Sequence, residues 1–226
     1  MENRIEIQYI RNFDTLLSDS IEMLFRAIDR ETDFDFAQTL ARNSMINSIL
    51  LLELVANICI ETLELERSVL NEIDRLSVLA KFDYFLRTSF RNKKIDRGVR
   101  QVEAINELKR LRDGYVHMKP HRIEMAMVGE YGEGQFDVTN LLGIPKNPQG
   151  WDQNYATIAM SAVHVFLKYY FKEKCEYSAS KVSSLLFSEE KNPGSGSLGI
   201  PLFYKTTKVQ LLNLGVDLSY LKLHWH

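Results

Sequence analysis

Residues 36–65 read FAQTLARNSMINSILLLELVANICIETLEL and carry the longest helical pattern in the chain. Apolar side chains recur in this segment three to four residues apart, which predicts one face of an amphipathic helix. They are Met45, Ile49, Leu52, Ala56, Cys59 and Leu63. A second stripe with the same spacing is polar, and we interpret it as the solvent-exposed face of the helix. Its members are Glu53, Asn57, Glu61 and Glu64.

Helical periodicity extends outward from this segment over most of the chain. Apolar residues three to four apart predict further helices both before and after it. These helices are expected at about 10–24, 76–89, 97 or 98 to 120, 152–175 and 178–187. The sequence therefore predicts a mostly α-helical bundle.

Two parts of the chain depart from the helical pattern. Residues 123–128 predict a strand, 129–134 a glycine-rich turn and 135–139 a second strand, so we expect a β-hairpin inserted at about 120–150. Residues 192–199 predict a flexible linker, and the last 27 residues predict short extended pieces. We therefore expect a bundle at 1–190 and a linker with a C-terminal extension at 191–226. The extension is rich in leucine, which indicates that it packs on the bundle or on a partner subunit.

The composition is that of an ordinary soluble globular protein, with 45% hydrophobic and 26% charged residues among 226. The two cysteines, Cys59 and Cys175, are too few for a disulfide scaffold, and we expect buried thiols. Residues 1–17 lack the pattern of a signal peptide. The apolar run 49–60 is shorter than a bilayer requires. We expect a cytoplasmic protein that does not bind membranes.

Charge is unevenly distributed along the chain. Residues 87–122 contain eleven Lys or Arg and four Asp or Glu, whereas the whole chain has a net charge of −2. A concentrated basic segment in a mildly acidic protein indicates an anionic ligand, and nucleic acid is the first candidate. The alternative is a solvated basic face packed near acidic helices.

Several other candidate motifs have plain structural explanations. No lysine and no helix follow the glycines between 129 and 134, so they indicate a hairpin turn and not a phosphate-binding loop. His164 is alone on an apolar helix, and we interpret it as a core histidine. The histidines at 224 and 226 provide too few ligands for a metal site. The sequence predicts neither a metal nor a cofactor.

One group of residues forms a candidate catalytic site. Residues 108–120 read LKRLRDGYVHMKP and contain Arg112, Asp113 and His117. On an ideal helix, five residues turn by about 500°, so the side chains of Arg112 and His117 diverge by roughly 140° along a rise of about 7.5 Å. This geometry does not bring both side chains of a single chain to one point. Two chains related by a two-fold axis can place two arginines and two histidines around one cleft.

These residue types fit cleavage of RNA by its own 2′-hydroxyl group. The reaction needs a proton acceptor for that hydroxyl, a proton donor for the leaving 5′-oxygen and positive charge beside the phosphorane. Histidine transfers protons near neutral pH, and arginine binds phosphate through its two-pronged guanidinium. Asp113 can orient either residue. The alternative is that all three are helix-end residues that solvate the helix dipole.

The motif and its context resemble the HEPN family. Arg112 and His117 enclose four residues at the end of a predicted bundle helix, and a polar residue, Asp113, directly follows the arginine. The resemblance covers roughly residues 36–175. It includes KFDYFL at 81–86, KIDRG at 94–98 and ELKRLR at 107–112.

The resemblance implies a helical bundle that commonly dimerises. Many HEPN domains are metal-independent endoribonucleases whose active site is built from the arginine and histidine of both subunits, so catalytic roles are implied for Arg112, His117 and Asp113. Other members are non-catalytic, which leaves an RNA-, nucleotide- or protein-binding module as the alternative. Lys119 stands where toxins of HEPN–nucleotidyltransferase pairs often carry a tyrosine. The inserted hairpin and the extension lie outside the minimal domain.

We therefore expect RNA and a second copy of the chain as partners, in a toxin or phage-defence role. An antitoxin or a nucleotidyltransferase is a further candidate partner. The basic residues expected to contact RNA are Arg91, Lys93, Lys94, Arg97, Lys109, Arg110 and Lys119.

Overall fold

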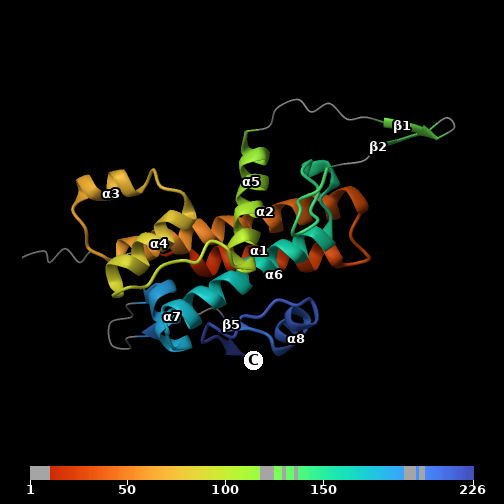
Figure 1. Cartoon of the computed structure of the whole chain (residues 1–226). Helices are drawn as coiled ribbons and strands as arrows, with labels where there is room; N and C mark the ends of the chain where they lie inside the picture. Colours follow the sequence, from red (N-terminus) through yellow and green to blue (C-terminus); the bar gives the residue numbers. More distant parts are fainter. Residues whose placement is uncertain (1–10, 118–124, 129–130, 135–136, 191–196, 199–201) are drawn as a thin grey trace, which may run out of the picture.

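The computed structural model describes residues 11–117, 125–128, 131–134, 137–190, 197–198 and 202–226. This part of the chain is mostly helical, as predicted (Figure 1). Its helices are α1 (Phe13–Ile28), α2 (Phe34–Glu61), α3 (Arg67–Ile73), α4 (Val78–Ser89), α5 (Arg100–Val116), η1 (Pro148–Gly150), α6 (Gln153–Lys168), the π-helical η2 (Tyr169–Lys174), α7 (Ala179–Leu186) and α8 (Lys205–Asn213). Its strands are β1 (Met125–Val128), β2 (Tyr131–Gly134), β3 (Glu189–Glu190), β4 (Ser197–Leu198), β5 (Leu202–Phe203) and β6 (His224–Trp225).

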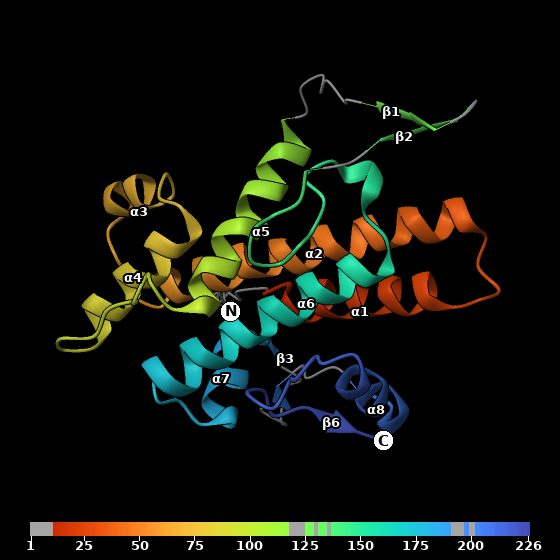
Figure 2. The same cartoon turned by 45° about the vertical axis from the view of Figure 1, so that its right-hand side comes forward.

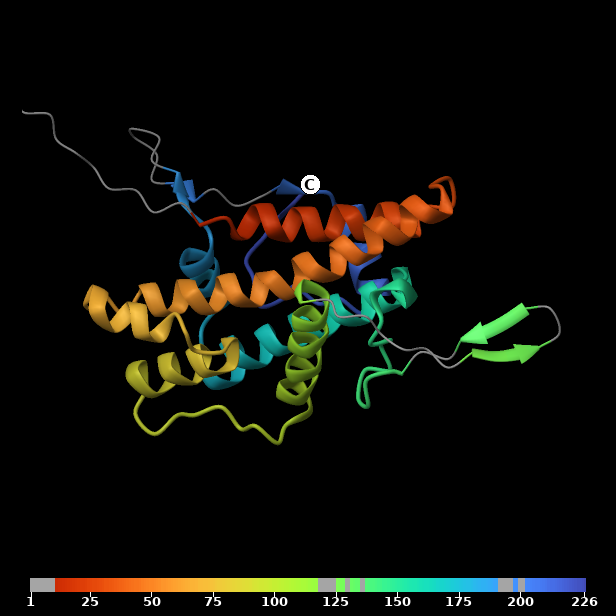
Figure 3. The same ribbon diagram turned by 90° about the horizontal axis from the view of Figure 1, so that it is seen from above.

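Helix α2 is the central element of the bundle. It begins at Phe34 because the side chain of Asp33 accepts hydrogen bonds from the backbone N–H groups of Asp35 and Phe36. Helices α1, α4 and α6 pack against it along most of its length (Figure 3). Five of the six side chains predicted for its apolar face are buried, and the sixth, Leu63, lies beyond the end of the helix.

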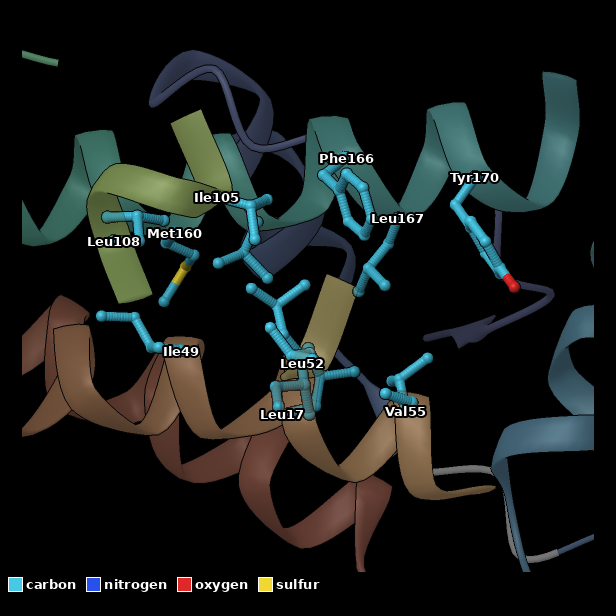
Figure 4. Packing of buried hydrophobic residues seen from close by; sticks show 14 of the residues in the cluster. Leu17, Ile49, Leu52, Val55, Ile105, Leu108, Met160, Phe166, Leu167 and Tyr170 are labelled. Atoms are coloured by element: carbon cyan, nitrogen blue, oxygen red, sulfur yellow. The ribbon is translucent and has the colours of Figure 1, made fainter. Parts of the chain in front are cut away.

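The hydrophobic core lies between α2 and α6, with contributions from α1 and α5 (Figure 4). Leu52 and Val55 of α2 are buried in the same cluster as Phe166 and Leu167 of α6. Burial of each such side chain stabilises the fold by about 1.5–3 kcal/mol relative to exposure. This packing fixes the positions of α2 and α5, which carry the candidate site.

Helix α2 also has the length and composition of a helix that can cross a membrane. In the folded chain, 61% of its most apolar 18-residue window is buried inside the protein. Its apolar side chains are therefore largely covered by the other helices.

The predicted hairpin is present, but its second strand was placed wrongly. Strand β2 spans Tyr131–Gly134 and pairs antiparallel with β1, with Val128 opposite Tyr131. The predicted turn is therefore incorrect at residues 131–134, because glycines 132 and 134 belong to the ladder, and residues 137–139 of the predicted second strand do not pair with β1. Residues 123–124, 129–130 and 135–136 of the prediction lie outside the described residues. The hairpin lies apart from the helices in all three views (Figures 1–3). A loop at 137–147 returns the chain to the bundle.

The C-terminal extension packs on α6, on the side opposite α5 (Figure 2). The extension was predicted to contain only short extended pieces, which was wrong because α8 is helical. In the predicted linker, Ser197–Leu198 form a strand that pairs with Glu189–Glu190. Ser161 donates a hydrogen bond to the carbonyl of Gly215, and Lys168 forms an ion pair with Asp217 at 2.6 Å. The apolar residues of the extension thus complete the core of their own chain.

Candidate functional site

Helix α5 positions Arg112 against α2. The helix begins at Arg100, two to three residues later than predicted, because Val99 is an extended N-cap residue. Ile105, Leu108 and Leu111 are buried in the core and set the rotation of the helix. The side chain of Arg112, which is 21% exposed, lies beside Glu53 of α2.

The guanidinium of Arg112 is held by carboxylates on two helices. Its Nη2 donates to Oε1 of Glu53, and its Nε lies 3.4 Å from Oδ1 of Asp113. Nε is buried and has no hydrogen-bond partner among the described residues. The ion pair with Glu53 restricts the arginine side chain to one orientation.

The contact with Glu53 was not predicted. We interpreted Glu53 as part of a solvent-exposed stripe, but its side chain is only 34% exposed because α5 crosses over it. The signal in the sequence was a carboxylate within the apolar run 49–60. Asn57, one turn further along the same stripe, is exposed as predicted.

His117 is the C-cap residue that follows α5 and is not itself helical. Its φ and ψ angles are −111° and 49°, and its N–H donates to the carbonyl of Asp113 at 3.0 Å. The ideal-helix divergence of 140° therefore does not describe the pair of Arg112 and His117. The side chain of His117 is exposed. The helix ends at Val116, ahead of the predicted end at Pro120, which lies outside the described residues.

Asp113 contacts basic residues of its own helix. Its Oδ2 accepts from Nζ of Lys109 at 2.6 Å, while Oδ1 lies near Arg112. Of the two roles predicted for Asp113, these contacts favour orientation of Arg112.

A cavity of about 370 Å³ opens beside Arg112. It lies between α2, the start of α4 and α5. Its lining is predominantly polar and charged, and the residues are Glu53, Asn57, Asp74, Arg75, Leu76, Ser77, Val78, Lys81, Lys109 and Arg112. Two residues of the predicted site, Lys109 and Arg112, therefore share one cavity.

Lys93, Lys94 and Arg97 line a different hollow, of about 740 Å³, next to η2. Glu173 also lines it, and Nζ of Lys93 lies 2.6 Å from Oε1 of Glu176. These acidic partners correspond to the alternative of a basic face near acidic helices. Of the other predicted RNA contacts, Arg91 and Arg110 are exposed on the surface, and Lys119 lies outside the described residues.

Three titratable groups remote from this site are buried, as predicted. Nδ1 of His164 lies 2.9 Å from the hydroxyl of Tyr220, and burial lowers the pKa of His164 to about 3. Cys59 and Cys175 are also buried, and burial raises the pKa of each thiol, to about 12 for Cys175. Across the described residues, no group of three or more His, Cys, Asp or Glu is placed to hold a metal ion.

No protein-family model, curated protein sequence or solved structure matches this chain.

Proposed function

We propose that this chain is a HEPN-type, metal-independent endoribonuclease in which Arg112 and His117 of two subunits act on one RNA phosphate. The observation that carries the proposal is the placement of Arg112. Its guanidinium is fixed by Glu53 beside a polar cavity, on a helix that ends at Val116 and is followed by the exposed His117.

Arg112 supplies positive charge where the phosphorane forms. A guanidinium has five N–H donors, and the contact with Glu53 uses only part of this set. The ion pair orients the side chain before substrate arrives, and such preorganised charge stabilises a transition state more effectively than a mobile group does.

His117 is proposed to transfer protons. The 2′-oxygen attacks phosphorus while one histidine accepts its proton, and the bond from phosphorus to the 5′-oxygen breaks as the partner's His117 donates a proton to that oxygen. The products are a 2′,3′-cyclic phosphate and a 5′-hydroxyl. The exposure of His117 at the helix end leaves it accessible to RNA and to a second subunit.

The test is RNA cleavage by the purified protein in the presence of a chelator. We expect His117→Ala to reduce the rate by about 10²–10⁴, and Arg112→Ala to reduce both rate and affinity. The exposed His224 provides the matched control, because His224→Ala leaves the proposed site intact. A 2′-deoxy nucleotide at the scissile position should block cleavage. Undiminished cleavage by His117→Ala, or cleavage that stops in chelator, would reject this mechanism.

A second candidate is a non-catalytic HEPN-type module that binds RNA, nucleotide or a protein. The contacts of Arg112 with Glu53 and Asp113 favour it, because two carboxylates already offset the guanidinium charge. Under this hypothesis the protein binds RNA with an affinity that falls steeply with salt but does not cleave it. A toxin or defence role, with an antitoxin or nucleotidyltransferase partner, belongs to the first candidate and stays a prediction from the resemblance.

A further inference from the structure

We infer that the cavity beside Arg112 is a phosphate-binding pocket, in which Lys81 contacts a phosphate of the RNA next to the one that is cleaved. The inference names the substrate-binding part of the same site and rests on the proposed function. It assigns a role to Lys81, which lies on α4, outside the segment around the Arg-x4-His motif.

Charged side chains dominate the lining of the cavity. Four cations and two carboxylates line it, and two carboxylates outside the lining pair with three of these cations: Asp113 with Lys109 and Arg112, and Glu72 with Arg75. The cations are Arg75, Lys81, Lys109 and Arg112, and the carboxylates are Glu53 and Asp74. Its volume of about 370 Å³ is within the range of pockets that hold small ligands and accommodates a phosphate with part of its nucleoside.

Lys81 differs from the other charged residues of this lining because it is buried. Only 9% of its surface is exposed, and a buried ammonium group is costly unless its charge is compensated. Its Nζ donates to the neutral amide oxygen of Asn57 at 2.8 Å and lies 3.5 Å from the carboxylate of Asp74. Asp74 is itself 72% exposed, so water weakens its attraction for the lysine.

These contacts leave binding capacity on Lys81. An ammonium group has three N–H donors, and one hydrogen bond, to Asn57, is formed among the described residues. A phosphate in the cavity would accept a further hydrogen bond and supply the charge compensation that Asp74 provides only in part. Lys109, on the facing helix, lines the same space.

The N-terminus of α4 contributes a positive electrostatic potential to the cavity. Ser77 and Val78 line the cavity, and the side chain of Ser77 makes no capping hydrogen bond. No acidic residue is present in the first turn of this helix. The positive end of the helix dipole therefore acts in the same direction as Lys81.

The test compares Lys81→Met with the wild type in two binding measurements. The first uses an RNA oligonucleotide whose scissile nucleotide is 2′-deoxy, so that binding is measured without cleavage, and the second uses inorganic phosphate at fixed ionic strength. We expect Lys81→Met to weaken RNA binding by about tenfold or more and to abolish the rise in melting temperature that phosphate gives the wild type.

Two further variants keep this test decisive. Lys168→Met is the matched control, because Lys168 also forms an ion pair with one aspartate, Asp217, but this pair lies between α6 and the C-terminal extension, away from the cavity. We expect Lys168→Met to bind RNA and phosphate as the wild type does. Arg75 is exposed and lines the cavity, so Arg75→Gln leaves the core intact and should weaken binding even if Lys81→Met does not fold.

The outcomes separate this inference from the proposed function. Wild-type affinity in a folded Lys81→Met, or an equal loss in Lys168→Met, overturns the pocket, and cleavage that still depends on His117 then leaves the nuclease standing. Phosphate binding that depends on Lys81 in a protein that cleaves no RNA supports the pocket and rejects the nuclease.

Discussion

His164 is a titratable side chain with no exposed surface. Burial lowers its pKa to about 3, with a smaller opposing effect of Asp217, so the imidazole is neutral in the folded protein at neutral pH. The unfolded chain protonates this residue near pH 6.5, and the unfolded state therefore binds more protons between about pH 3 and 6.5. Its contribution to stability is present above pH 6.5 and is lost as the pH falls.

We accordingly expect His164 to reduce the free energy of unfolding by about 1.4 kcal/mol for each pH unit below 6.5. Urea unfolding between pH 7 and pH 5 measures this slope. In His164→Gln the slope should become shallower. Equal slopes in wild type and His164→Gln would show that the buried imidazole has no such effect.

The sequence predicted the residues of the candidate site that lie close together in the chain, and it missed those contributed by distant segments. Arg112, Asp113 and His117 were predicted because they are close in sequence and their chemistry is recognisable. Glu53 was missed because it lies 59 residues from Arg112, and only the crossing of α5 over α2 brings the two together. The same holds for Lys81, whose sequence position gives no sign of its burial beside Asn57.

At the scale of elements, Glu107 anchors the loop at 137–147 to α5. Its carboxylate accepts hydrogen bonds from the N–H groups of Leu141 and Leu142 at 2.9 and 3.0 Å. Burial alone would raise the pKa of Glu107, but these backbone hydrogen bonds lower it below the usual value. The anchoring is thus present above the pKa of an unfolded glutamate and is lost as the pH falls through the lowered value.

We expect Glu107→Ala to destabilise the protein by about 1.5–3 kcal/mol, because two N–H groups lose a charged acceptor. Hydrogen exchange at the amides of Leu141 and Leu142 should accelerate first. Glu103, one turn earlier and exposed, is the control, and Glu103→Ala should leave this exchange unchanged. Unchanged protection in Glu107→Ala would mean that other contacts hold the loop.

The elements predicted well are those with long apolar faces, such as α2 and α6. Helix α8 was missed because its sequence, KTTKVQLLN, contains two threonines and a valine and buries only Leu211. Such a helix depends on the packing of neighbouring segments more than on its own periodicity. The hairpin was shifted because glycines favour turns, whereas the observed register places glycines 132 and 134 in a strand.

At the scale of the whole molecule, the prediction of a dimer now depends on the end of α5. The apolar extension, which also motivated it, packs on α6 of the same chain. Exposed Val116, with 56% of its surface accessible, precedes His117 and offers an apolar contact there. We expect light scattering at micromolar concentration to give the mass of a dimer, and Val116→Lys to shift it toward a monomer with loss of RNA cleavage.

Mixtures provide the matching functional check. If each site uses residues of both subunits, combining Arg112→Ala with His117→Ala protein should give activity that is not the mean of the two. The activity of the mixture should depend on the fraction of mixed dimers and on how many intact Arg112 and His117 residues each of their sites contains. A wild-type protein that is monomeric and cleaves RNA would contradict the shared site.

Contacts between segments far apart in the sequence complete the core, and this affects folding during synthesis of the chain. The ring of Phe13, at the start of α1, packs 5.3 Å from that of Phe187, and Tyr220 seals the far side of α6 at His164. A ribosome makes α1 and α2 long before it makes either partner. During that interval α1 can cover only part of α2, and the apolar side chains of α2 that pack against α6 are uncovered in the growing chain. We expect a chaperone that captures nascent apolar sequences to bind this segment and to dissociate once α6 has emerged.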